Sequence, residues 1–141
     1  MAIKEHPKIG SILTCRFEPG FVAPEMVKRR PVLVLSPKIM NRDQLCTVVC
    51  LSTTAPKPPM SYHCQIDFAP ELPDHLESFG VWVKADMVYS VGFHRLDLIG
   101  LGKDASGKRL YYYDTVSVAG MKKVRACVLN GLGMQGLTKN L

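Results

Sequence analysis

Four residues suited to catalysis stand at the ends of short apolar runs in this sequence. The runs begin at residues 31, 47 and 81, and the four residues are Arg30, Thr53, Lys84 and Asp86. A short apolar run between breakers is typical of a buried strand. Because a sheet holds the ends of its strands rigidly, we expect the four side chains to meet in one polar site.

One chemistry that such a site supports is metal-free cleavage of RNA, in which the 2′-OH attacks the adjacent phosphate. The reaction needs a proton acceptor, charge stabilisation for the phosphorane and a proton donor for the leaving oxygen. Arg30 is the best candidate for the phosphate, because a guanidinium binds two oxygens in a fixed fork and, being always protonated in proteins, is a poor base. Asp86 is a candidate base or base-orienting group, and Lys84, two residues earlier, should share its face of the strand.

Basic residues in two loops are candidates for RNA binding: Lys28, Arg29, His94 and Arg95. The reference pKa of histidine, about 6.5, also suits acid–base catalysis, so His94 is either a catalytic or a substrate-contacting surface residue. Three of the four candidate catalytic residues also have ordinary structural interpretations. Arg30 could pair with Glu25, Thr53 could cap a strand and Asp86 could hold a turn.

Composition limits the class of protein. A chain of 141 residues with 47% hydrophobic residues fits one folded domain spanning 1–141. Its net charge of +6 favours an anionic partner, and nucleic acid is the commonest. No run approaches the roughly 18 apolar residues of a membrane span, and no apolar leader opens the chain. These features predict a cytoplasmic protein with no membrane partner.

The five cysteines, at positions 15, 46, 50, 64 and 127, form no C-x-x-C pair. Zinc sites normally use paired ligand spacing, so we expect no metal and no cofactor. A buried free cysteine behaves as a small hydrophobe, which is the role expected for all five.

The elements that position the site are mainly β, with one C-terminal helix. Strands are expected near residues 12–17, 31–36, 46–52, 64–68, 81–84, 86–91 and 95–99, and an exposed turn at 102–107. Val118, Met121, Val124, Val128 and Leu132 recur at helical spacing, which predicts a helix over about 117–130 with Ser117 as N-cap. Residues 131–141 are expected to form a flexible tail. Strands first and helix last favour a barrel or curled sheet closed by the helix.

The order of these motifs resembles the PemK/MazF family of toxin endoribonucleases. Gly10 precedes the first strand, residues 30–37 read R-P, an apolar strand and S-P, residues 53–54 read T-T, and residues 85–90 read A-D-x-x-x-S. The match covers roughly residues 8 to 132. The connector 55–79 is longer and richer in proline than in shorter members, and some members have arginine where Lys84 stands.

The resemblance implies an SH3-like small barrel that cleaves single-stranded mRNA without a metal. It points to Arg30 and to the Thr53 hydroxyl at the scissile phosphate. It also implies a cognate antitoxin and a homodimer; an acidic antitoxin segment should compete with RNA for Lys28, Arg29, Arg30 and Arg95. The apolar residues beyond those of one core are predicted to form the dimer interface, and they include Val81, Trp82, Val88 and Tyr89.

Two other functions remain open on the same fold. One is a catalytically inactive SH3-like module that binds nucleic acid. The other is a toxin that poisons DNA gyrase through the end of its chain, which the glycine-rich segment 131–141 disfavours because it has no aromatic anchor.

Overall fold

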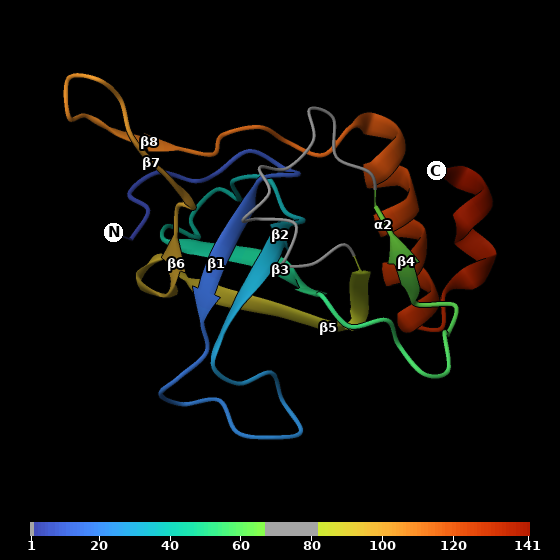
Figure 1. Cartoon of the computed structure of the whole chain (residues 1–141). Helices are drawn as coiled ribbons and strands as arrows, with labels where there is room; N and C mark the ends of the chain where they lie inside the picture. Colours follow the sequence, from blue (N-terminus) through green and yellow to red (C-terminus); the bar gives the residue numbers. More distant parts are fainter. Residues whose placement is uncertain (1, 67–81) are drawn as a thin grey trace.

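The computed structural model describes residues 2–66 and 82–141. Six strands form one antiparallel sheet in the order β4-β5-β3-β2-β1-β6 (Figure 1). Their bounds are β1 Ile12–Arg16, β2 Arg29–Val34, β3 Leu45–Ser52, β4 His63–Gln65, β5 Trp82–Gly92 and β6 Leu96–Asp97. A 3-10 turn, η1 (Phe93–Arg95), joins β5 to β6, and β7 (Gly100–Lys103) and β8 (Arg109–Tyr111) form a separate hairpin. The chain continues into helix α2 (Val118–Gly131) and the 3-10 helix η2 (Gln135–Asn140).

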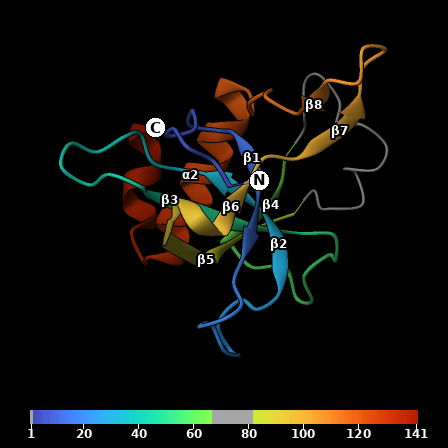
Figure 2. The same cartoon turned by 90° about the vertical axis from the view of Figure 1, so that its left-hand side faces the viewer.

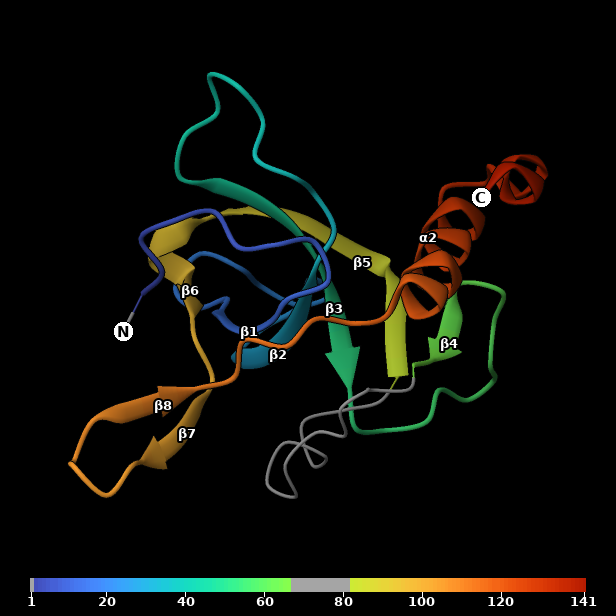
Figure 3. The same ribbon diagram turned by 90° about the horizontal axis from the view of Figure 1, so that it is seen from above.

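The sheet is strongly curved, and β5 bends sharply along its length (Figure 3). The bend lies where its pairing with β3 is interrupted, because Val49 pairs with Val88 whereas the next residue, Cys50, pairs with Lys84. Residues 85–87 of β5 therefore bulge out of the ladder, and such bulges re-aim a strand. In the described part of the chain the edge strands β4 and β6 do not pair with each other. The expected small, mainly β fold with a C-terminal helix is confirmed, with a curled rather than a closed sheet.

The central strands are buried on both faces, which explains their continuous apolar runs. On one face Leu33 and Val49 pack with Met121 and Val124 of α2. On the other face a second cluster fills the concavity of the sheet; it includes Val32, Val48, Cys50, Phe17 and Leu96. Arg30 lies two residues before Val32, so strand alternation places it on this second face.

Helix α2 begins as expected, because the Ser117 hydroxyl accepts a hydrogen bond from the Gly120 N–H at 3.0 Å. The predicted apolar stripe is wrong at both ends. Val118 is 81% exposed and Leu132 is 64% exposed, whereas Met121 and Val124 between them are buried. The helix approaches β5 closely near its end, where a Cβ added to Gly131 would lie 2.9 Å from the Ala85 carbonyl oxygen. Beyond it, η2 contacts α2 within the segment expected to be a flexible tail.

Several strand predictions need correction. β2 begins at Arg29 rather than at Pro31, and the strands expected at 81–84 and 86–91 are one strand, β5. The strand expected at 95–99 is only β6, and the β7–β8 hairpin was not predicted. Residues 67–68 of the strand expected at 64–68 lie outside the described residues.

The predicted dimer interface is also only partly available. Val81 lies outside the described residues. Val88 packs against the core cluster beneath α2, and Tyr89 packs against the cluster on the opposite face. The sequence could not show this, because the bulge at 85–87 decides which face each residue joins.

One hairpin stands apart from the body of the molecule. The β7–β8 hairpin projects away from the sheet, on the side opposite α2 and the C-terminus (Figures 1 and 2). No helix among the described residues has the length and apolar character needed to cross a membrane.

Candidate active site

A polar pocket of about 480 Å³ lies where β2 begins, β3 ends and β5 begins. It is lined by Met26, Arg29, Arg30, Pro31, Leu51, Ser52, Thr53, Thr54 and Lys84. The structure thus brings together three of the four residues singled out as catalytic and one of those expected to bind RNA. No carboxylate is among the described lining residues, so the pocket presents cations and hydroxyls to whatever enters it. It is suited to a phosphate group.

Strand register explains why Arg30 and Lys84 meet. Cys50 of β3 lies between Val32 on one side and Lys84 on the other. Continuing the β2–β3 register, Arg30 comes opposite the end of β3, next to Thr53. The cations therefore project from both sides of the β3 terminus, while the hydroxyls follow directly from its last residue.

Arg30 is exposed and, in the described part of the chain, makes no ion pair. The pairing with Glu25 considered above does not form, because the Glu25 carboxylate instead accepts a hydrogen bond from the Val22 N–H at 3.4 Å. A guanidinium held at a strand end without a protein anion is available for an anionic ligand.

Arg29 and Arg30 have different environments. Arg29 Nη2 lies 4.0 Å from the Asp97 carboxylate, and Arg16 Nε lies 3.1 Å from the same oxygen. Asp97 is 6% exposed, so this carboxylate anchors the two arginines at the edge of the sheet. Arg29 therefore contributes less uncompensated charge to the pocket than Arg30.

The turn after β3 presents Thr53. The Ser52 hydroxyl accepts a hydrogen bond from the Thr54 N–H at 3.1 Å and so shapes this turn. Thr53 is exposed, and its hydroxyl forms no hydrogen bond with the residues that the structure describes. Thr53 can therefore donate to a ligand, whereas Ser52 is already engaged.

Asp86 lies at the rim rather than in the lining. It is exposed on the bulge of β5, and like Lys84 it faces away from the buried Val83 and Ala85. Burial raises the pKa of the Cys50 thiol to about 12; the negative charge of Asp86 adds to this shift, while Lys84 and Arg30 oppose it. Asp86, Lys84 and Arg30 thus all act on one buried thiol, and that thiol stays neutral near pH 7.

His94 and Arg95 do not join the pocket, since they lie in η1, beyond the end of β5 opposite to Lys84. Arg95 donates hydrogen bonds to the carbonyls of Arg16, Phe17 and Pro19 at 2.9–3.0 Å. It also lies 5.1 Å over the Phe21 ring. Arg95 therefore holds the β1–β2 loop in place, a structural role that differs from the RNA-binding role predicted for it. His94 is exposed, and its carbonyl accepts a hydrogen bond from Arg16.

The β1–β2 loop carries two further residues near the pocket. Lys28 is exposed in the left-handed region at φ 68°, and its carbonyl accepts a hydrogen bond from the Phe17 N–H at 3.0 Å. Met26, a lining residue that sequence reasoning missed, is fixed by a 3.0 Å hydrogen bond from its N–H to the Tyr89 hydroxyl. Nothing in the local sequence marks Met26, because a contact 63 residues away places it.

The described residues contain no group of three or more His, Cys, Asp or Glu side chains placed to hold a metal ion. The five cysteines are free, and all but Cys64 are buried. Burial raises the pKa of Cys15 to about 12 and that of Cys46 to about 11.

Comparison with known proteins decides the family. A family model described as the PemK-like, MazF-like toxin of type II toxin–antitoxin systems matches residues 8–129. The chain belongs to the PemK/MazF family. Among curated relatives, the uncharacterised protein YifN of Escherichia coli (strain K12) is 34% identical over 115 residues, covering 69% of this chain and 76% of YifN.

Solved structures share the PemK/MazF fold. MazF from Deinococcus radiodurans matches with a TM-score of 0.61 and 23% identity, covering 93% of this chain and 100% of that one. An endoribonuclease from a Mycobacterial species, solved in complex with its cognate antitoxin, matches with a TM-score of 0.59 and 20% identity, covering 92% and 97% of the two chains. At these identities the likeness establishes the fold.

Proposed function

We propose that this protein is the toxin of a type II toxin–antitoxin pair and a metal-independent endoribonuclease that cleaves single-stranded RNA. The observation that carries the proposal is the pocket that joins Arg29, Arg30 and Lys84 to the Thr53 hydroxyl. Family membership supports it, because the family is one of toxins. Solved structures of the same fold include proteins named endoribonucleases.

In the proposed reaction the ribose 2′-oxygen forms a bond to the neighbouring phosphorus and the bond from phosphorus to the 5′-oxygen breaks. Arg30 binds two phosphate oxygens, and the Thr53 hydroxyl donates to a non-bridging oxygen. These preorganised donors stabilise the charge of the phosphorane. Because the nucleophile belongs to the substrate, the protein does not need to activate a water molecule.

Two protons must move in this reaction. Asp86, at the rim of the pocket, accepts the 2′-OH proton or orients the group that accepts it. Lys84 lies in the lining and donates a proton to the leaving 5′-oxygen. The products are a 2′,3′-cyclic phosphate and a 5′-OH.

The proposed partners bind at the same pocket. Two solved structures of the same fold are named as MazE–MazF complexes from Deinococcus radiodurans. We infer a cognate antitoxin whose acidic segment competes with RNA for Lys28, Arg29 and Arg30. The proposal also includes a cytoplasmic location, since the substrate is mRNA. It further includes a homodimer.

The experiment that tests the proposal is incubation of the purified protein with a long mixed-sequence RNA in EDTA. We expect discrete cleavage that is unchanged by the chelator. Binding without cleavage would support the alternative of a catalytically inactive nucleic-acid-binding module. Loss of cleavage in EDTA, restored by a divalent cation, would contradict the metal-independent mechanism.

A further inference from the structure

A second basic pocket lies at the far end of the β3–β5 pair, opposite the candidate active site, which is called the Arg30 pocket below. It has a volume of about 810 Å³ and is formed by residues 4–9, the loop 37–44 and Phe93. Leu45 pairs with Gly92 at this end, whereas Ser52 pairs with Trp82 at the other. At about 3.3 Å per residue, the two pockets are separated by roughly 20–25 Å along β3.

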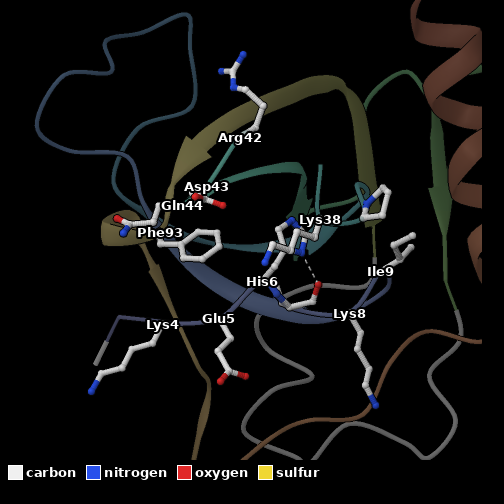
Figure 4. Close-up of a pocket in the computed structure, with 12 residues that line it drawn as sticks. Lys4, Glu5, His6, Lys8, Ile9, Lys38, Arg42, Asp43, Gln44 and Phe93 are labelled. Atoms are coloured by element: carbon white, nitrogen blue, oxygen red, sulfur yellow. Dashed lines mark hydrogen bonds between the residues drawn. The ribbon is translucent and has the colours of Figure 1, made fainter. Parts of the chain in front are cut away.

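Cations dominate the rim of this second pocket. Lys4, Lys8, Lys38 and Arg42 line it together with only two carboxylates, those of Glu5 and Asp43. All four cations are exposed, and they come from two segments distant in sequence. In Figure 4 Lys4, Lys8 and Arg42 extend outward around the rim, with the Phe93 ring nearer the centre. Four cations against two carboxylates leave the pocket with an excess of positive charge, which attracts a polyanion.

The floor of the pocket is aromatic and preformed. The His6 and Phe93 rings meet edge to face, with centroids 5.9 Å apart. The Phe93 N–H donates to the Gln44 carbonyl at 3.0 Å, which ties the loop 37–44 to η1. His6 Nε2 is buried and has no hydrogen-bond partner among the described residues, whereas Nδ1 contacts the Pro7 carbonyl at 2.8 Å. A buried polar atom without a partner marks a place where an added group can complete the bonding.

The tip of the loop 37–44 supplies apolar contact surface beside the cations. Ile39 is 53% exposed and Met40 is 84% exposed. Surfaces that bind single-stranded nucleic acid combine cations for the backbone with aromatic side chains for the bases, and here the Phe93 ring lies among the cations. An acidic peptide would use the cations but would gain less from this combination.

We propose that this pocket is an RNA exosite, a binding site for the phosphate backbone of a substrate segment remote from the cleaved bond. The proposal rests on the proposed endoribonuclease function. Contacts to phosphate position a substrate without reading its sequence. The exosite therefore strengthens the binding of long RNA and leaves the choice of cleavage site to the Arg30 pocket.

The test compares the binding of two 2′-deoxy-substituted oligonucleotides, which the protein can bind but not cleave. One spans about 3 nucleotides, too few to bridge the roughly 20–25 Å between the two pockets. The other spans about 20, more than the about 4–16 nucleotides that a single-strand-binding OB fold covers. The variant is Lys38→Ala/Arg42→Ala. A matched control, Lys122→Ala/Lys123→Ala, removes the same charge from the exposed face of α2.

For Lys38→Ala/Arg42→Ala we expect the Kd of the long oligonucleotide to rise about tenfold and its salt slope to fall by about 1.4, as two lost phosphate contacts predict. The Kd of the short oligonucleotide and the behaviour of the control should not change. Wild-type affinity and salt slope for the long oligonucleotide would overturn the exosite. Weaker binding of an acidic antitoxin peptide, with RNA binding unchanged, would also overturn it and assign the pocket to a protein.

Cleavage is measured separately, so the two proposals can fail separately. RNA cleavage by the wild type with unaltered binding by the variant leaves the enzyme standing and removes the exosite. Absence of cleavage, with selective loss of long-oligonucleotide binding in the variant, removes the enzyme and leaves an RNA-binding pocket. Wild-type protein that binds neither oligonucleotide overturns both.

Discussion

Arg30 is an exposed cation of the candidate active site, and it makes no ion pair with the described residues. Arg30→Ala should lower kcat by on the order of 10²-fold or more, because it removes preorganised charge at the phosphorane. Arg30→Lys should recover only part of this loss, since lysine cannot bind two oxygens in a fork. Single-turnover cleavage assays measure both variants, with circular dichroism to confirm the fold. Wild-type kcat in a folded Arg30→Ala protein would contradict the assignment.

Asp97, unlike Arg30, has a structural role, because it is buried and bound to Arg16 and Arg29. Asp97→Ala should lower the free energy of unfolding, since it leaves two arginines without their anion. Because both arginines are substantially exposed to water, the loss should be limited to about 1–3 kcal/mol. Urea denaturation measures the effect. The exposed Asp43→Ala is the control and should stay within about 0.5 kcal/mol of the wild type. Equal stability of both variants would show that Asp97 does not anchor the arginines.

At the scale of elements, the β1–β2 loop depends on one side chain from η1. Arg95→Ala removes three hydrogen bonds to the carbonyls of Arg16, Phe17 and Pro19 and the contact with Phe21. We expect faster hydrogen exchange over residues 17–28 and a raised KM for RNA, because this loop carries Met26 into the pocket. Arg109→Ala, in the exposed β7–β8 hairpin, is the matched control. Unchanged exchange over 17–28 would mean that the loop holds its shape without Arg95.

The elements divide clearly into those that the sequence predicted and those that it did not. β2 and β3 were predictable because burial on both faces leaves a continuous apolar run. The β7–β8 hairpin was not predictable, because its strands are largely exposed and carry no alternation. The single strand β5 was divided in prediction at the bulge 85–87.

The candidate site was predictable to the same extent as its strands. Arg30, Thr53 and Lys84 lie at strand ends, so knowing the strands was enough to place them together. Asp86 falls at the rim because it belongs to the bulge, which depends on pairing with β3. The role of Arg95 depends on contacts with Arg16 and Pro19, which are separated from it by 79 and 76 positions in the sequence. The local sequence holds no signal for contacts at such a distance.

At the scale of the whole molecule, exposed apolar residues favour assembly. The outer side of β6 is bridged by Ala2, which pairs with Asp97, but apolar side chains are exposed after α2, among them Leu132, Met134 and Leu137. Exposed apolar surface of this kind invites a second copy. Sedimentation equilibrium at micromolar concentration should therefore give about twice the monomer mass of 15.7 kDa. A strict monomer over that range would refute the homodimer.

The central claim is that this PemK/MazF-family protein cleaves RNA by attack of the substrate's own 2′-OH. Mass spectrometry of the fragments produced in EDTA tests it most directly, with an RNA carrying one 2′-deoxyribose at the mapped cleavage site as the matched substrate. The mechanism predicts 2′,3′-cyclic phosphate and 5′-OH ends from the all-ribose RNA and no cleavage at the deoxyribose position. Fragments with 5′-phosphate ends, or cleavage that continues at the deoxyribose, would contradict it.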